Sequence, residues 1–225
     1  MQYNEVIARL KAEANPANAA GMARFGISST NTLGISIYTL RKIAKEIKKE
    51  HELALKLWDS GIHEARLLAG FIDEPDKVTE AQLERWVNDF DSWDIVDQAS
   101  ELISKTPYVI KKIHEWSTRE AEFVKRAAFS LIAEVAWYDK TLTDKDLEEF
   151  FTIIKNAATD EQNYVKKAVN WALRNIGKRN QALNRRAIEV AKEIQKMDSK
   201  AARWIAADAL RELTGEVIQK RVADK

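Results

Sequence analysis

The sequence predicts an all-α protein built as a curved α-solenoid of antiparallel helix pairs. Three observations lead to this fold class. The chain has only 7 Gly and 3 Pro in 225 residues, which disfavours loop-rich β architectures. Apolar residues recur at the helical period between these breaks, and no segment alternates persuasively as a strand does. Related segments also recur at about 40 residues, as expected when helix pairs stack one on another.

Helix breaks divide the chain into segments of about 10 to 18 residues. They fall at Asn15-Pro16, Gly26 to Gly34, Ser60-Gly61, Glu74-Pro75, Thr106-Pro107, Gly177 and Gly215. The stretch from Phe25 to Leu40 is uncharged and rich in Ser, Thr, Ile and Gly. Because its glycines interrupt any alternation, we expect a loop that enters a helix.

Two helix starts carry capping signals. Thr79-Glu80 precedes an apolar-periodic run, and Thr143-Asp144-Lys145-Asp146 places a hydroxyl and then carboxylates together. Unpaired N–H groups and the helix dipole favour these residue types in the first turn. We therefore expect one helix to begin after Thr79 and another after Thr143.

Internal similarity indicates the repeat. Residues 123–129 and 164–170 match in type at a spacing of 41, and weaker copies lie at 64–69 and 202–207. Helical units at roughly 30 to 45 residues are typical of HEAT-like pairs stacked into a solenoid. We expect a single HEAT-like domain over residues 1–225, with one helix of each pair lining a concave wall.

The polar face of the segment from Trp93 to Ile103 is unusual. At about 100° per residue its apolar side chains form one arc, which consists of Ile95, Val96, Ala99, Leu102 and Ile103. Trp93, Asp97 and Ser100 fall on the opposite side. A tryptophan one turn before a carboxylate on a polar face stands out, because so large a ring is normally buried.

Two later segments show a related pattern. In residues 164–178, Trp171 lies off the apolar arc, and three cations flank it: Lys167, Arg174 and Lys178. In residues 124–137, a narrow second face of mostly small side chains consists of Arg126, Ser130, Ala133 and Trp137. We expect this face to be open, so that a ligand can approach the guanidinium of Arg126 closely.

These faces carry the groups that a nucleic-acid surface needs. Cations bind phosphates and aromatic planes stack on bases, while Asp97 supplies one isolated carboxylate. The alternative is that each tryptophan packs against the adjoining helix pair, that the basic stripes are solvated, and that Asp97 is an ordinary surface acid. The sequence pattern alone leaves both interpretations open.

Composition excludes several other classes. The 36 Lys+Arg and 35 Asp+Glu leave a net charge of +1, which gives no net field toward nucleic acid. Zero Cys excludes disulfides, thiolate zinc sites, iron–sulfur clusters and cysteine nucleophiles. The sequence has three scattered His, no nucleotide-binding glycine motif, no signal peptide and no apolar run near 18 residues. We expect a cytoplasmic protein without metal, cofactor or membrane partner.

Several blocks together resemble one family. They are Met22-Ala23-Arg24-Phe25, Leu33-Gly34-Ile35, Leu57-Trp58, Ser92-Trp93-Asp94-Ile95-Val96-Asp97, Arg126-Ala127-Ala128 and Lys167-Ala168-Val169-Asn170-Trp171-Ala172-Leu173-Arg174. Their order and types are similar to the AlkD-type DNA alkylation repair family, HEAT-like repeat glycosylases that excise purines alkylated on ring nitrogens. The Trp-Asp-x-x-Asp and Lys-Ala-x-x-Trp-x-Leu-Arg blocks are the most specific.

The resemblance implies roles for individual residues. Asp97, Trp93 and Trp171 correspond to the catalytic cleft, and Arg126 to an arginine that grips the backbone near the lesion. Further DNA contacts are expected from Lys167, Arg174, Lys178, Arg24 and Phe25. The chain departs from the best-known branch at Phe25, where that branch has tyrosine, and at Ser36, where it has glutamine.

The resemblance thus implies a monomeric DNA glycosylase that excises cationic alkylated purines from double-stranded DNA in base excision repair. Such a purine is already positive, so its glycosidic bond breaks without a general acid. One carboxylate, Asp97, then suffices to stabilise the oxocarbenium-like sugar and to orient water. The alternatives are a non-catalytic HEAT-like module that binds branched or damaged DNA, and a protein-binding solenoid.

Overall fold

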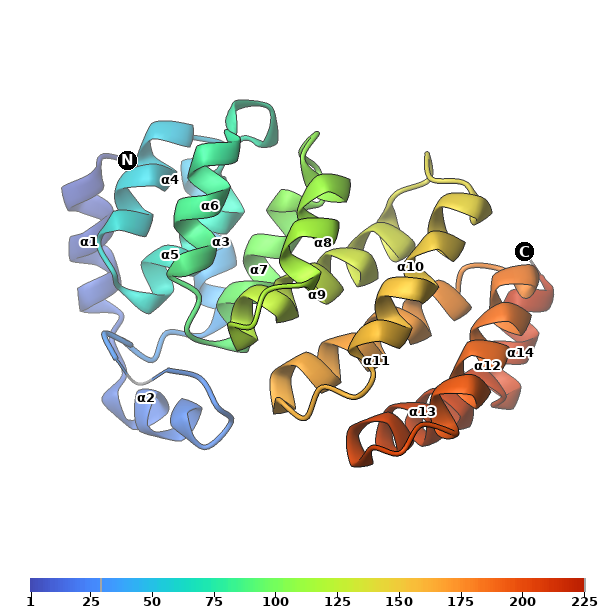
Figure 1. The fold of residues 1–225 in the computed structure, drawn as a ribbon. Helices are drawn as coiled ribbons and strands as arrows, with labels where there is room; N and C mark the ends of the chain where they lie inside the picture. Colours follow the sequence, from blue (N-terminus) through green and yellow to red (C-terminus); the bar gives the residue numbers. More distant parts are fainter. Residues whose placement is uncertain (29, 225) are drawn as a thin grey trace. The chain divides into compact units, whose positions relative to one another are not determined.

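The computed structural model describes residues 1–28 and 30–224, and the chain divides into two compact units, Met1–Tyr108 (unit 1) and Val109–Lys225 (unit 2). Over the described residues the secondary structure consists of fourteen α-helices and one short 3-10 helix, without a strand (Figure 1). The prediction of an all-α fold is confirmed. That residues 1–225 act as one domain with a curved basic groove stays a prediction.

Unit 1 contains seven α-helices and the 3-10 helix η1. They are α1 (Tyr3–Ala12), α2 (Pro16–Ala23), α3 (Ile37–Ile47), α4 (His51–Asp59), α5 (His63–Ile72), η1 (Pro75–Lys77), α6 (Glu80–Asn88) and α7 (Trp93–Ile103). Helix α5 is central, because α3, α4 and α7 all pack against it. The predicted loop before α3 is present in its described residues, with residue 29 outside the description, and α3 begins after the N-cap Ser36.

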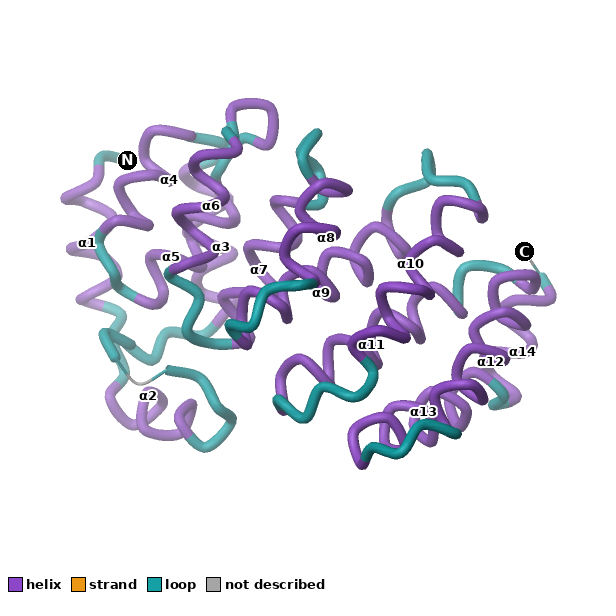
Figure 2. Tube along the Cα trace, in the orientation of Figure 1, coloured by secondary structure: helices purple, strands orange, loops and turns teal. Residues whose placement is uncertain are grey.

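Unit 2 repeats a simpler pattern. Its helices are α8 (Val109–Ser117), α9 (Glu122–Tyr138), α10 (Asp144–Ala157), α11 (Asn163–Gly177), α12 (Gln181–Gln195), α13 (Lys200–Leu213) and α14 (Glu216–Ala223). Consecutive helices pair across short loops, α8 with α9, α10 with α11 and α12 with α13, and α11 also packs against α9 and α13 (Figure 2). Stacked helix pairs of this kind form an α-solenoid, as predicted.

The internal repeat marks equivalent positions. The copies at spacing 41 open α9 and α11, and the weaker copies open α5 and α13. Side chains bond between these equivalent helices: Asn175 Nδ2 donates to the Ala133 carbonyl at 3.1 Å, and Asn170 Nδ2 to Asp208 Oδ2 at 2.7 Å. The sequence repeat therefore corresponds to a repeated contact.

The predicted helix starts have the expected caps. Thr79 Oγ1 accepts the Gln82 N–H at 3.2 Å at the start of α6. Thr143 and Asp146 form a capping box at the start of α10, in which each side chain accepts the backbone N–H of the other residue. These bonds satisfy N–H groups that have no partner within the helix.

Two predictions about helix faces are wrong. Ser100 is fully buried (0% exposed), although the helical wheel placed it beside Trp93 and Asp97. The second face of α9 is not open: Arg126 is 6% exposed, and Ser130 and Ala133 are completely buried. The reason for α9 is that α8 and α11 both pack on it, so that a helix inside the stack is covered on more than one side.

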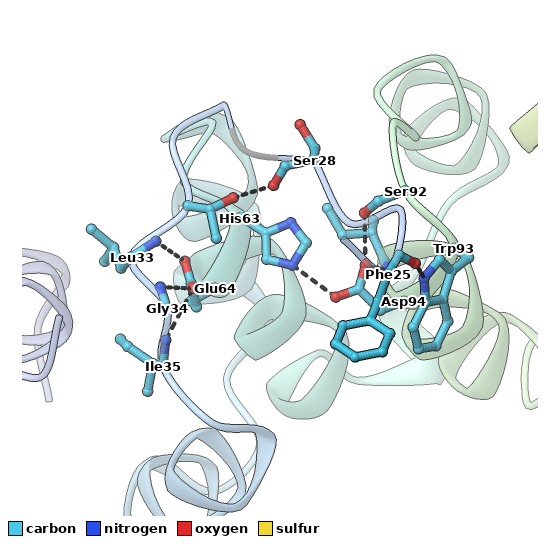
Figure 3. Close-up of polar contacts among 12 residues, drawn as sticks. Phe25, Ser28, Leu33, Gly34, Ile35, His63, Glu64, Ser92, Trp93 and Asp94 are labelled. Carbon is cyan, nitrogen blue, oxygen red and sulfur yellow. Dashed lines mark hydrogen bonds and ion pairs between the residues drawn. The ribbon is translucent and has the colours of Figure 1, made fainter. Parts of the chain in front are cut away.

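A buried carboxylate holds the loop that enters α3. Glu64, in the first turn of α5, is fully buried and accepts the backbone N–H groups of Leu33 at 2.8 Å, Gly34 at 2.6 Å and Ile35 at 3.2 Å (Figure 3). These three donors satisfy the buried carboxylate. Gly34 has φ +79°, and a Cβ there would overlap the Asn15 carbonyl, so the loop needs glycine.

An ion pair joins the starts of α5 and α7. His63 Nε2 lies 2.8 Å from Asp94 Oδ2, while the Ser92 hydroxyl and the Ile95 N–H donate to Asp94 Oδ1 at 2.7 and 3.0 Å (Figure 3). Burial opposes both charges, yet the hydrogen bond and charge of the partner outweigh it. They raise the pKa of His63 and lower the pKa of Asp94. The two helices therefore begin side by side.

This ion pair predicts a pH-dependent stability. Because the folded-state pKa of His63 is raised, the charged pair stabilises the folded protein fully at pH values below the unfolded pKa of about 6.5. This stabilisation is lost as pH rises through the folded-state pKa. We expect His63→Gln, a neutral donor to Asp94, to lower the free energy of unfolding by roughly 1 to 2 kcal/mol at pH 5.5 and by much less at pH 8.5.

Urea unfolding at both pH values measures this difference. The matched control is His114→Gln, which removes an exposed imidazole in α8. If His63→Gln lowers the free energy of unfolding by the same amount at both pH values, the assignment of a charged pair is contradicted.

Packing at Gly177 gives a second stability prediction. A Cβ at this last residue of α11 would lie 2.7 Å from Leu213 Cδ2 and 2.9 Å from Ala187 Cβ. We expect Gly177→Ala to destabilise by about 1 to 3 kcal/mol because of overpacking. Gly21→Ala in α2, where no atom lies within 4 Å, should instead stabilise by up to about 1 kcal/mol. Thermal unfolding followed by circular dichroism measures the melting temperatures of both variants. Equal shifts in melting temperature would show that packing around the glycine does not determine the effect of the added methyl group.

Candidate functional site

Unit 1 brings Trp93 and Asp97 onto one face of α7. They are four residues apart, about one helical turn, and both side chains are half-buried. The apolar arc on the other side of α7 is buried as predicted. An indole and a carboxylate thus lie next to each other at the surface of the helix that the His63–Asp94 pair holds in place.

The loop after α2 is tied to this face. Trp93 Nε1 donates a hydrogen bond to the carbonyl of Phe25 at 3.0 Å (Figure 3). The ring of Phe25 is 75% exposed, and Arg24 beside it is also exposed. Unit 1 therefore gathers an exposed aromatic ring, a half-buried indole and a half-buried carboxylate from segments 68 residues apart in sequence.

Ser36, the second departure from the family pattern, has a structural role. Its hydroxyl oxygen accepts the Thr39 N–H at 3.2 Å and caps α3. A side chain used in this way fixes the start of a helix next to the Leu33-Gly34-Ile35 block.

In unit 2, Trp171 lines a pocket of about 270 Å³ on the surface between α9 and α11. The other lining residues are Glu134, Trp137, Tyr138, Asn175 and Lys178. The Trp137 ring lies 4.5 Å from the Arg221 guanidinium carbon and 5.7 Å from Lys178 Nζ. Cations therefore lie close to one indole of the pocket, at distances that favour cation–π attraction.

Two of the predicted phosphate-binding cations are paired with acids of α13. Lys178 Nζ lies 2.9 Å from Glu212 Oε1, and Arg174 forms ion pairs with Glu212 and, at 3.5 Å, with Asp208. Burial opposes the charge of Glu212, but the Lys178 hydrogen bond and the two cations outweigh it and lower its pKa. The basic stripe beside Trp171 is thus largely neutralised within the protein.

Sequence reasoning missed these acids because it examined each helix alone. Glu212 follows Arg174 by 38 residues, and Asp208 follows Asn170 by the same interval. The repeat spacing near 40 is the signal that could have located these acids opposite the α11 residues, because residues one repeat apart lie on neighbouring helices.

Arg126 and Lys167 differ sharply in exposure. The nearly buried Arg126 donates from Nη1 to the carbonyl of Tyr164 at 3.0 Å, which ties α9 to the first turn of α11. Lys167 is exposed, with Nζ 5.5 Å from the centre of the Tyr164 ring. Of the predicted cations in unit 2, Lys167 is therefore the one most accessible to an external anion.

Neither a metal-binding cluster nor a membrane-spanning helix is found in the part of the chain that is described. Residues 1–28 and 30–224 contain no group of three His, Cys, Asp or Glu side chains able to hold a metal ion. Within the same residues, no helix combines the length and the apolar character that crossing a bilayer requires.

Comparisons with known proteins agree with the fold. Two uncharacterized Listeria proteins are 24% identical: one of Listeria innocua serovar 6a over 200 residues and one of Listeria monocytogenes serovar 1/2a over 203 residues, each covering 87% of both chains. A solved structure has a TM-score of 0.81 at 20% identity, covering 99% of this chain and 96% of its own. It is described as "a new family of proteins related to the HEAT-like repeat DNA glycosylases with affinity for branched DNA structures".

The family comparison covers nearly the whole chain. The solved structure establishes the shared fold, and the family model described as "DNA alkylation repair enzyme" matches residues 6–213. Together with the stacked helix pairs and their sequence repeat, this match shows that the chain belongs to the family of DNA alkylation repair enzymes.

Proposed function

We propose that the protein is a monofunctional DNA glycosylase that hydrolyses the N-glycosidic bond of cationic alkylated purines in duplex DNA. The observation that supports this most is the Trp93–Asp97 pair on α7, with the Phe25 carbonyl bonded to the indole. The proposal includes action as a cytoplasmic monomer in base excision repair, without a cofactor.

Asp97 has the chemistry that this reaction needs. Alkylation on a ring nitrogen gives the purine a positive charge, so the base can leave without protonation. The developing charge then resides on the sugar, where a fixed carboxylate stabilises it electrostatically and orients the attacking water. Ordinary glycoside hydrolases need a second carboxyl group as an acid, and this reaction does not.

The aromatic residues and cations have the remaining roles. Trp93 and Trp171 are proposed to contact the alkylated nucleotide, whose positive charge is attracted to indole faces. The exposed ring of Phe25 and the neighbouring Arg24 are proposed to contact DNA. Because Arg126 is nearly buried and bonded to Tyr164, we assign it to positioning α11 as well as to the backbone contact that the family resemblance implies.

Phosphate contacts are assigned to Lys167, Arg174 and Lys178. Lys167 is exposed and available, while the other two share Glu212. Phosphate groups must compete with this carboxylate for them. Their contribution to DNA affinity is therefore smaller than their charge suggests.

A second candidate is a non-catalytic module that binds branched or damaged DNA. The solved structure of the same fold belongs to a group described as having affinity for branched DNA. The pairing of Arg174 and Lys178 with Glu212 also makes the phosphate contacts predicted for a glycosylase weaker. Under this alternative Asp97 is dispensable.

Replacing Asp97 separates the two candidates. We expect Asp97→Asn, which keeps the shape and removes the charge, to slow release of alkylated purines by about 10² or more, with duplex affinity unchanged or slightly higher. Glu101→Gln, one turn further along α7, is the matched control and should release base at the wild-type rate. Single-turnover release from methylated duplex measures both.

Two outcomes would count against the glycosylase. One is Asp97→Asn releasing base as fast as the wild type, which would exclude the assigned role of the carboxylate. The other is a wild type that binds DNA but releases no base, which would favour the non-catalytic module.

Removing Glu212 should strengthen DNA binding. Glu212→Gln removes the carboxylate that Arg174 and Lys178 share, so we expect affinity for duplex DNA to rise several-fold at low salt. The slope of log K against log [salt] should also steepen by up to about 0.9 for each phosphate newly contacted.

The matched control is Glu193→Gln, which breaks a comparable pair with Lys155 at 2.9 Å between α10 and α12. Fluorescence anisotropy over a salt series compares the variants. Equal affinities for Glu212→Gln and the control would show that the α11 cations do not bind phosphates.

A further inference from the structure

The exposed face of α3 is a row of cations with a tyrosine at one end. Its members are Tyr38, Arg41, Lys42, Lys45 and Lys48, the last being the C-cap residue. Their spacing of three and four residues places them on one side of the helix. Leu40 and Ile43, on the other side, are fully buried in unit 1. We call these five residues the α3 face.

The charges of this face are not paired within the described residues. Within the described part of the chain, none of its four cations forms an ion pair with an acid. Glu46, one position further round the helix, is engaged by Arg9 of α1. The guanidinium of Arg41 lies 5.7 Å from the centre of the Phe71 ring. This contrasts with α11, whose cations Arg174 and Lys178 share Glu212.

The charge arrangement is unfavourable for an isolated helix. Arg41 and Lys45 are four residues apart, and Lys45 lies three residues from both Lys42 and Lys48, so like charges repel along the face. The helix dipole favours cations in the last turn, near Lys45 and Lys48, but not Arg41 or Lys42 near the middle. An external polyanion would relieve this repulsion.

The α3 face is set apart from Trp93 and Asp97. Helices α3 and α7 both pack against α5, and Glu64 and the His63–Asp94 pair hold the three helix starts at one end. Lys49, just beyond α3, donates to the carbonyls of Phe71 and Asp73 at 2.9 and 2.8 Å, so α3 and α5 also end together. Lys45 and Lys48 therefore lie roughly 15 Å along the helix direction from Trp93.

We propose that the α3 face is a second DNA-binding surface, which binds the phosphate backbone of duplex DNA beside the segment that Trp93 and Asp97 contact. Its cations extend over about 10 Å of helix, comparable with three successive phosphates of one strand at about 3.4 Å along the duplex axis. The hydroxyl of the exposed Tyr38 donates to phosphate at one end. Contacts of this kind bind any DNA sequence.

An anionic membrane is a poorer partner for this face. A helix that lies on a membrane inserts its apolar side into the lipid boundary. The apolar side of α3 is occupied by the core of unit 1, and Tyr38 is the one large exposed apolar ring on this helix. The proposal rests on the proposed function in one respect, namely that DNA is the ligand, and it holds for both the glycosylase and the non-catalytic module.

The test removes three charges and measures affinity for unmodified duplex DNA. The triple variant Lys42→Gln, Lys45→Gln, Lys48→Gln should bind about tenfold or more weakly at low salt, and the salt slope should fall by up to about 2.7 for three lost phosphate contacts. The matched control is Lys145→Gln, Lys192→Gln, Lys196→Gln, which removes three exposed charges from α10 and α12 or its C-cap and should change the slope little.

Stability excludes a structural explanation. Glutamine keeps the helix propensity of lysine and removes repulsion, so the melting temperature of the α3 variant should be equal to that of the wild type or higher. An α3 variant whose affinity and slope equal those of the control overturns the proposal. So does one that keeps its duplex affinity but loses binding to vesicles containing phosphatidylserine.

Base release keeps this test separate from the proposed function. If the wild type releases alkylated purine, the α3 variant at saturating concentration should release it at the same single-turnover rate. If the wild type releases base but the α3 variant binds duplex DNA as tightly as the wild type, only the proposal of the second DNA-binding surface is overturned. If the α3 variant binds more weakly but the wild type releases no base, only the glycosylase proposal is overturned, and the second DNA-binding surface is supported.

Discussion

The buried carboxylate of Glu64 is the constraint on which unit 1 depends. A carboxylate without exposure to water must find donors within the protein, and it finds three in the backbone of Leu33, Gly34 and Ile35. That requirement fixes the loop, the loop fixes the start of α3, and the adjacent His63–Asp94 pair fixes the start of α7. Trp93 and Asp97 have a defined position because the helix that carries them is held at its first turn.

In unit 2, charged side chains are paired between equivalent helices. Its equivalent helices are joined by polar contacts one repeat apart, and Glu212 places its charge between Arg174 and Lys178. A net charge of +1 therefore does not reflect evenly mixed surfaces. Arg174 and Lys178 are paired with acids of α13, whereas among the described residues no acid forms an ion pair with the four cations of the α3 face. The local distribution of charge, more than its sum, decides where a polyanion can bind.

The sequence predicted the helices better than their surroundings. The helix from Trp93 to Ile103 and the Thr143 cap follow from local spacing and residue type, and both are present. The burial of Ser100 and Arg126 was not predictable from a helical wheel, which assigns one buried side to each helix. In a stack, a helix such as α9 is covered both by its pair partner α8 and by α11 of the next pair.

We propose that this member of the DNA alkylation repair family breaks glycosidic bonds. The most direct measurement is release of free 7-methylguanine or 3-methyladenine from methylated duplex DNA by the purified wild-type protein, with the abasic sites counted in parallel. We expect free base and abasic sites in equal amounts. Tight binding of the same duplex with neither product would contradict glycosylase activity.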